Sequence, residues 1–137
     1  MLKTALNKRF GLSIFSILLI SLMSFPLFGQ FTRQDSLRGG LNEERTWWNV
    51  IYYHLDIAVD IEEKSIAGRN TVHFVPNKAG QTLQMDLQPH MTMTKVVYEG
   101  QDLSVRQEGN AHFIQFPELC EADETYIFTI YFEGQPP

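Results

Sequence analysis

The feature that most constrains the fold is an alternation of large apolar side chains with polar or small ones between Tyr53 and Ile61. Side chains on a strand point to opposite faces in turn, so this period of two predicts a β-strand with one apolar face. A polar turn at 62–65 and a second run at 66–75 follow it, which predicts an antiparallel hairpin. The apolar face consists of Tyr53, Leu55, Ile57, Val59 and Ile61 on the first strand and Ile66, Val72 and Phe74 on the second.

The remainder of the chain consists of short runs rich in Val, Ile, Thr, Tyr and Phe, broken by Gly, Asn, Pro and Asp. Roughly seven runs with turn residues about every 8 to 12 positions predict an all-β fold, either an antiparallel β-sandwich or an open curved sheet. The last run, at 125–132, is apolar on both faces and requires cover on both sides. Because few strands remain to cover it, we expect an exposed apolar edge and marginal stability.

The first 30 residues have the layout of a signal peptide, because a basic start precedes an apolar run at 10–28. We therefore expect an N-terminal signal helix at 1–30, cleavage after Gly29 or Gln30, and export to the periplasm, the cell surface or the medium. Membrane contact is then limited to this segment before cleavage. The alternative is a retained membrane helix, since the run approaches the ~20 residues that span a bilayer.

Two further regions follow the signal segment. The stretch 31–44 is polar, contains Gly39 and Gly40 in succession and shows no periodicity, so we interpret it as a flexible leader. The β-rich region at 45–137 is about 100 residues long, which is enough for one small domain.

Charge and cysteine content exclude several classes of protein. The net charge of −5 is spread along the chain, and no basic cluster indicates a nucleic-acid partner. Cys120 is the only cysteine, so an intrachain disulfide is impossible. We expect Cys120 to be a small buried apolar residue.

The predicted hairpin brings three possible metal ligands together. If Ile61 lies opposite Ile66, the two apolar faces stay together and His54 lies opposite His73. Opposed positions hold Cβ atoms about 5 Å apart, so His54 and His73, with Asp56 on the same face, are the candidates for a metal site. A catalytic zinc needs three protein ligands with a supporting second shell. The alternative, a solvated polar face without an ion, explains the same residues, and we favour it.

The sequence contains no complete catalytic motif. No histidine is followed by glutamate, as the His-Glu-x-x-His helix of zinc peptidases requires, and a Gly-x-Ser-x-Gly elbow and a phosphate-binding loop are also missing. We therefore assign no catalytic, cofactor-binding or metal-binding residue. Trp47, Trp48 and Tyr52 are candidates for a surface that recognises sugar or peptide, although such aromatics more often close the end of a sheet.

Several motifs in order resemble the start of the N-terminal domain of zinc aminopeptidases of the aminopeptidase N type. The pattern Tyr-x-Leu-x-Ile-x-Val-Asp lies at 53–60, and Ser-Ile-Ala-Gly follows at 65–68. Met-Asp-Leu lies at 85–87, and a Val-x-Tyr-x-Gly turn lies at 96–100. The resemblance covers nearly all of the chain from Arg45 onward.

The resemblance implies a saddle-shaped, mostly antiparallel β domain beside a thermolysin-like catalytic domain, which would be the partner of this chain. Zinc, its ligands and the general-base glutamate belong to that catalytic domain, so no cofactor is implied within this chain. Relative to the family, the domain at 45–137 is incomplete. We expect a non-catalytic scaffold whose parent enzyme releases N-terminal residues from peptides; the alternative is a free-standing secreted β-sandwich module that binds sugar or peptide.

Overall fold

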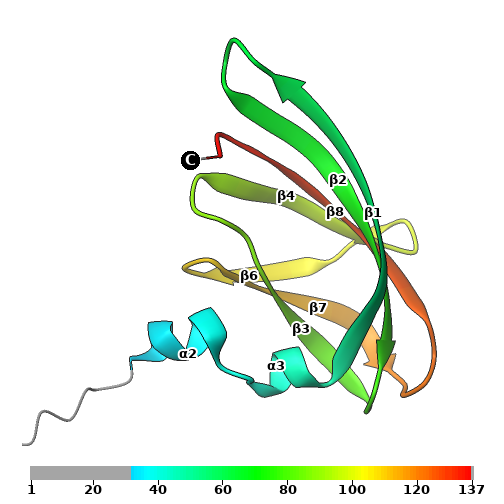
Figure 1. Cartoon of the computed structure of the whole chain (residues 1–137). Coiled ribbons are helices and arrows are strands. Elements are labelled where there is room, and N and C mark those ends of the chain that lie inside the picture. Colours follow the sequence, from blue (N-terminus) through cyan, green and yellow to red (C-terminus); the bar gives the residue numbers. More distant parts are fainter. Residues whose placement is uncertain (1–31, 137) are drawn as a thin grey trace, which may run out of the picture. The chain divides into compact units, whose positions relative to one another are not determined.

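The computed structural model describes residues 32–136, which form two antiparallel sheets preceded by two short helices (Figure 1). The prediction of an all-β sandwich or open sheet is confirmed. The predicted signal helix at 1–30 lies outside the described residues. No helix between residues 32 and 136 has the length and apolar character needed to cross a membrane.

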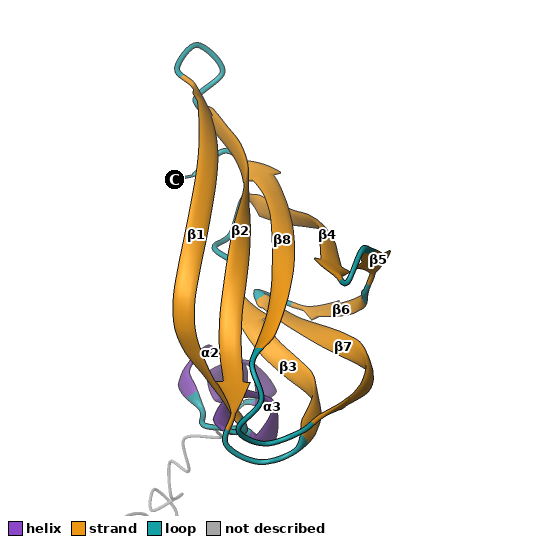
Figure 2. Ribbon diagram, turned by 90° about the vertical axis from the view of Figure 1, so that its right-hand side faces the viewer, coloured by secondary structure: helices purple, strands orange, loops and turns teal. Residues whose placement is uncertain are grey.

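The larger sheet has five strands in the spatial order β1-β2-β8-β4-β5 (Figure 2). Every neighbouring pair is antiparallel. Its outermost strands differ greatly in length, because β1 has 13 residues and β5 has two. The strands are β1 (Trp48–Asp60), β2 (Ser65–Pro76), β8 (Tyr126–Gly134), β4 (Met91–Tyr98) and β5 (Gln101–Asp102).

The smaller sheet has the order β3-β7-β6 and is also antiparallel. Its strands are β3 (Gly80–Asp86), β7 (Ala111–Cys120) and β6 (Ser104–Glu108). Strand β7 continues past Pro117 to Cys120. The side chain of Gln81 supports this extension, because its Nε2 donates to the carbonyl of Phe116 at 3.0 Å.

The two sheets enclose a core built around Phe74, which is fully buried. Five aromatic rings surround it with centroid distances between 5.5 and 5.8 Å, within the range of favourable aromatic pairs. Burial of such large apolar side chains is the main force that holds the two layers together. The surrounding rings are those of Trp47, Trp48, Phe116, Tyr126 and Phe128.

The register of the β1–β2 hairpin differs from the predicted one by two residues. Val59 lies opposite Ile66, and His54 lies opposite Thr71. The turn sets this register: four residues connect the strands, Lys64 adopts a positive φ of 50°, and Asp60 accepts a hydrogen bond from the backbone of Glu63. A shift of two keeps every side chain on its predicted face.

The segment predicted to be a flexible leader, 31–44, instead carries helices α2 (Arg33–Gly39) and α3 (Glu43–Thr46). Thr32 caps α2 in a capping box with Asp35, and Asn42 caps α3 by accepting from the backbone of Arg45. These caps satisfy backbone donors that would otherwise be unpaired, so a short polar segment becomes helical.

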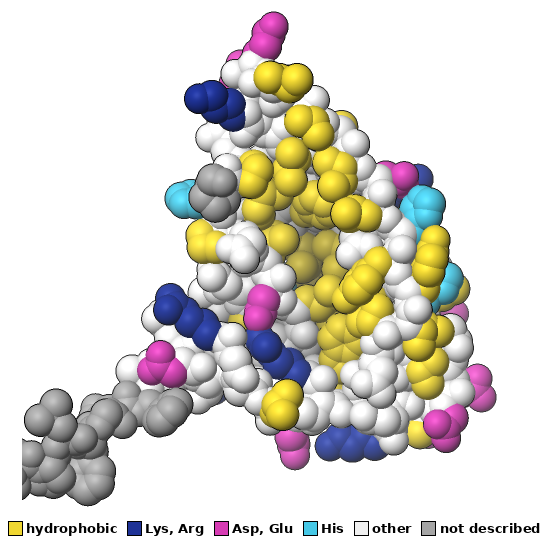
Figure 3. All heavy atoms as spheres, in the orientation of Figure 1, with side chains coloured by type: hydrophobic (Ala, Val, Ile, Leu, Met, Phe, Trp, Pro, Cys, Tyr) yellow, Lys and Arg dark blue, Asp and Glu magenta, His cyan; other side chains and the backbone are white. Residues whose placement is uncertain are grey.

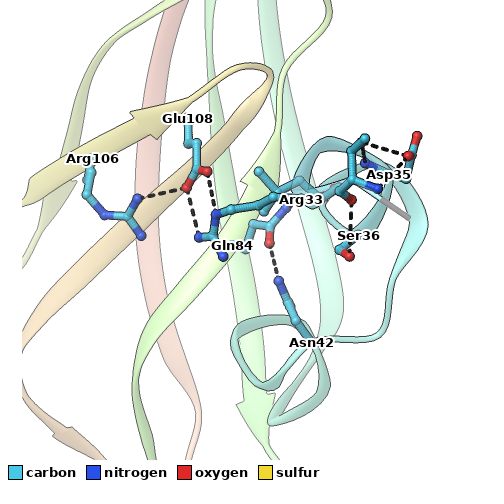
Figure 4. Close-up of polar contacts among 9 residues, drawn as sticks. Arg33, Asp35, Ser36, Asn42, Gln84, Arg106 and Glu108 are labelled. Carbon is cyan, nitrogen blue, oxygen red and sulfur yellow. Dashed lines mark hydrogen bonds and ion pairs between the residues drawn. The ribbon is translucent and has the colours of Figure 1, made fainter. Parts of the chain in front are cut away.

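Hydrogen bonds connect both helical segments to the smaller sheet (Figure 4). Arg33 donates two hydrogen bonds to the carboxylate of Glu108, at 2.5 and 2.9 Å. Asn42 donates to the buried Gln84 at 2.5 Å, and Leu37 is buried beside Phe113 on the outer face of this sheet. The helices therefore cover one face of the smaller sheet.

Candidate functional site

The inner face of the larger sheet is covered along only part of its length. Phe74 and Phe128 are buried beneath the smaller sheet. Towards the β1–β2 turn the same face continues with Leu55, Ile57 and Val59, which are 54%, 48% and 67% exposed. Figure 3 shows hydrophobic side chains lining a hollow and continuing beyond it over this part of the molecule. The sandwich is therefore packed at one end and open at the other.

The open part of this face contains a cavity of about 360 Å³. Its lining is mostly apolar and comes from both sheets and from the chain end near Pro136. Three methionines contribute, and flexible thioether side chains adapt well to varied partners. We call this region the open face; it is formed by Leu55, Ile57, Ile66, Met91, Met93 and Phe132.

Asn70 is a polar residue within this apolar lining. It lies between Leu55 and Ile130 in the sheet, and its Oδ1 is buried without a hydrogen-bond partner among the described residues. A buried acceptor left unpaired costs about 1–3 kcal/mol. A molecule that covers the open face and donates to Asn70 Oδ1 would recover this cost.

The three candidate metal ligands lie on the opposite, outer face of the hairpin. His54 and His73 do not face each other, because His73 lies opposite Tyr52 and contacts its ring edge-on at 5.0 Å. Asp56 accepts a hydrogen bond of 2.7 Å from Arg69, and this bond lowers the pKa of the Asp56 carboxyl. Within 32–136, no group of three such side chains is arranged to hold a metal ion.

The three aromatic candidates for a recognition surface differ in exposure. Trp47 is only 3% exposed, and its indole donates to the carbonyl of Thr82 at 2.7 Å. Trp48 is partly buried and donates to the carbonyl of Glu44 at 2.9 Å. Only Tyr52 remains accessible, so the two tryptophans act in packing, which was the alternative interpretation.

Burial disfavours the charged form of three titratable side chains. Burial raises the pKa of the Cys120 thiol to about 11, and it raises the pKa of Tyr98 to about 12. Burial also lowers the pKa of His112, whose Nδ1 lies 3.2 Å from the carbonyl of Asn110. Cys120 is therefore the small buried residue that the sequence predicts and has little thiolate at neutral pH.

Comparison with solved structures finds a similar fold in zinc peptidases. The M1 zinc metallopeptidase of Deinococcus radiodurans superimposes with a TM-score of 0.61 at 17% identity, covering 69% of this chain. A mutant of that enzyme bound to a Tyr-Ser-Ala substrate gives 0.60 at 17% identity over 67% of the chain. The chain has the fold of part of an M1 zinc metallopeptidase.

The M1-like fold accounts for only a small part of those enzymes. The chain spans 22% of the Deinococcus radiodurans enzyme and 15% of leukotriene A4 hydrolase from Saccharomyces cerevisiae, which matches with a TM-score of 0.50 at 18% identity over 63% of this chain. No family model and no curated protein matches the sequence.

The open face is a site that the sequence alone did not reveal. Apolar and polar side chains alternate visibly on the strands that carry Met91, Met93 and Phe132. These three side chains lie on the inner face, which they share with Leu55. The sequence therefore indicated that these side chains are apolar and lie on one face of each strand. What the sequence could not show is that these side chains stay partly exposed beside the smaller sheet.

Proposed function

We propose that this chain is a non-catalytic scaffold domain that docks against the catalytic domain of a zinc metallopeptidase through the open face. The observation that carries the proposal is the exposed apolar part of the inner face, within a fold that is shared with M1 zinc metallopeptidases. Contiguous exposed apolar surface of this kind marks interaction sites in soluble proteins.

The energetics favour a protein partner over solvent. Full burial of a Leu or Ile side chain contributes about 1.5–3 kcal/mol, and Leu55 and Ile57 are about half exposed. Covering them would therefore contribute roughly 1 kcal/mol each. A donor aimed at Asn70 Oδ1 would add specificity to this apolar contact.

In this proposal the chemistry belongs entirely to the partner. The catalytic domain would supply zinc, its ligands and the general base, and it would release N-terminal residues from peptides. The β domain would hold that domain in position and form part of the wall around the substrate. The polar outer face, with Asp56 bound to Arg69, has no role in this chemistry.

The test is to mix the full chain with an M1-type catalytic domain from the same organism, prepared without its own β domain. We expect a stable complex that hydrolyses aminoacyl-arylamide substrates faster than the catalytic domain alone does. A chelator should abolish turnover both in the complex and in the catalytic domain alone. Met93→Asp should abolish the complex, because it places a charge on the open face. Ile127→Asp is the matched control, since Ile127 is 47% exposed on the larger sheet but is absent from the cavity lining. Failure of the wild-type chain to bind would overturn the proposal.

The second candidate is a free-standing module that binds apolar peptides. The cavity of about 360 Å³ and the unpartnered Asn70 oxygen favour it, because a peptide offers both apolar side chains and backbone donors. The apolar lining favours peptide over sugar. Calorimetric titration with short Leu- and Phe-rich peptides distinguishes the binding module from the scaffold. Saturable 1:1 binding supports the module, and no detectable binding supports the scaffold.

We also propose that the chain acts outside the cytoplasm, on the strength of the basic start and the apolar run at 10–28. Mass spectrometry of the chain from the producing cell tests this proposal. A mature N-terminus at residue 30 or 31 would support a cleaved signal. An intact chain in the membrane fraction would support the retained helix instead.

A further inference from the structure

A second cavity lies between α2 and the smaller sheet. It has a volume of about 470 Å³, within the range of ~300–1,000 Å³ that small-molecule sites occupy. One wall is a face of α2, and the other is formed by the end of β3 and by the turn between β6 and β7. Residues 86–88 line both this cavity and the open face, whereas the residues of α2 line this cavity alone. We call it the α2 cavity; it is formed by Gln34, Leu37, Arg38, Glu108, Asn110 and Ala111.

Contacts within the molecule hold both walls of the α2 cavity in place. Arg33 donates two hydrogen bonds to the carboxylate of Glu108, at 2.5 and 2.9 Å, and Arg106 donates to the same carboxylate at 3.2 Å (Figure 4). Leu37 is buried, and its carbonyl accepts from Arg45 at 2.7 Å. These contacts fix the helix to the sheet, so a ligand does not have to order the walls when it binds.

The carboxylates that line the α2 cavity are already paired with arginines. Arg33 and Arg106 both bind Glu108, and Arg45 binds Asp86. Three guanidinium groups thus balance two carboxylates, so these pairs carry no negative charge although the whole chain carries −5. The cavity can therefore accept an anion.

Arg38 lines the cavity as well and differs from the other three arginines. None of the ion pairs within residues 32–136 involves it. The carboxylate of Asp35, one turn earlier on α2, accepts from the backbone and the hydroxyl of Thr32, at 3.0 and 2.6 Å. Arg38 is exposed, and the planar fork of its N–H donors matches a carboxylate, which arginine binds through two parallel hydrogen bonds.

Neutral amide side chains lie on both walls of the cavity. Gln34 comes from α2, and Asn110 comes from the turn between β6 and β7. An amide side chain both donates and accepts hydrogen bonds, as a peptide group does. The buried Leu37 and Ala111 contribute apolar surface. The α2 cavity thus offers a cation, amide groups and an apolar surface.

We propose that the α2 cavity binds the C-terminal end of a short peptide. Arg38 binds the terminal carboxylate, and the amides of Gln34 and Asn110 pair with the last peptide group. An apolar side chain on the last residue of the peptide packs on Leu37 and Ala111. This ligand presents one negative charge, hydrogen-bond donors and acceptors, and an apolar group, and each of these has a counterpart in the cavity.

Two other classes of ligand fit this cavity less well. A phosphate group carries about 1.5–2 negative charges at neutral pH, and the carboxylates of Asp86 and Glu108 would repel the additional charge. The base of a nucleotide is usually held by stacking on an aromatic ring. None of the described residues that line the cavity is aromatic.

This inference is separate from both functions proposed for the open face. Arg38, Gln34 and Asn110 do not line the open face, and Met93 does not line the α2 cavity. A peptide on the open face binds through its side chains, so conversion of its carboxylate to an amide has little effect there. A Met93→Asp chain that has lost docking should therefore still bind the carboxylate peptide.

The experiment is calorimetric titration of the full chain in mild detergent with N-acetyl-Ala-Ala-Leu, whose only charge is its carboxylate. We expect saturable 1:1 binding. The same peptide with a C-terminal amide should bind about tenfold more weakly or worse, because charge-assisted hydrogen bonds are stronger than neutral ones. Inorganic phosphate should not displace the carboxylate peptide.

Substitutions test the assigned roles. Arg38→Gln should raise the Kd about tenfold or more. Arg38→Lys keeps the charge in the last turn of α2 and should weaken binding less. Lys95→Gln is the matched control, because it removes an equal charge from the larger sheet, where Lys95 lies over the Tyr131 ring. Absence of saturable binding, equal binding of the amide, or an unchanged Kd in Arg38→Gln would each overturn the proposal.

Discussion

The carboxylate of Asp56 accepts a 2.7 Å hydrogen bond from Nε of Arg69, its directly opposed neighbour on β2. This ion pair lies on the outer face of the hairpin, where the alternation of the sequence places polar side chains. It engages the carboxylate that lies two residues from His54 on that face. The polar face is therefore a network of internal contacts, and the binding surface lies on the other side of the same strands.

Acid should weaken the Asp56–Arg69 pair in a defined range of pH. The hydrogen bond from Arg69 lowers the pKa of Asp56 in the folded state, so the pair stabilises the fold above the unfolded pKa of about 3.9. This stabilisation is lost as the pH falls through the lower folded-state pKa. Asp56→Asn should therefore lower the free energy of unfolding slightly at about pH 6, and this difference should shrink as the pH falls through the folded-state pKa of Asp56.

Urea denaturation of the wild type and Asp56→Asn across this range measures the difference. Arg69→Met removes the same pair from the other side and should give the same pH dependence. A difference that grows as the pH falls would contradict the expected sign of the effect.

Zinc should not bind at the hairpin. His54 lies opposite Thr71, and the Asp56 carboxylate is held by Arg69, so the side chains do not converge on one point. Calorimetric titration with zinc should show no stoichiometric site, and His73→Ala should behave as the wild type does. A 1:1 isotherm that disappears in His73→Ala would restore the metal-site hypothesis.

The core should be far more sensitive to substitution than the open face. Phe74→Ala removes a fully buried ring that five other aromatic rings contact, and such changes cost about 3–5 kcal/mol. Val59→Ala is the matched control, because Val59 continues the inner face beside the open face, is 67% exposed, and should cost below about 1 kcal/mol when truncated. Equal losses in urea denaturation would mean that the open face is packed in solution.

Local alternation predicted the strands well because it depends on neighbouring side chains alone. The two faces of the hairpin, for example, were assigned correctly. The register was wrong because it depends on the backbone conformation at Lys64, which has a positive φ. Helix α2 was missed although Thr32 and Asp35 carry a capping-box pattern, since a run of seven residues shows little periodicity.

The location of exposed apolar surface could not be predicted from any single strand. We expected β8 to need cover on both faces, and Ile127 on its outer face is instead 47% exposed. The exposed apolar edge is β1, because β8 lies inside the sheet between β2 and β4. Strand order and the reach of the smaller sheet decide such exposure, and both depend on contacts distant in sequence.

Oxidation of the methionines on the open face measures directly whether a catalytic domain covers this surface. Met91 and Met93 line the cavity and are partly exposed, so dilute peroxide should convert them to sulfoxides in the isolated full chain. When a saturating amount of an M1-type catalytic domain is present, mass spectrometry should show that Met91 and Met93 are oxidised several-fold more slowly. The methionine of Ile127→Met, on the outer face, should be oxidised at an unchanged rate. Unchanged oxidation of Met91 and Met93 within a complex, or protection of residue 127 instead, would contradict the account.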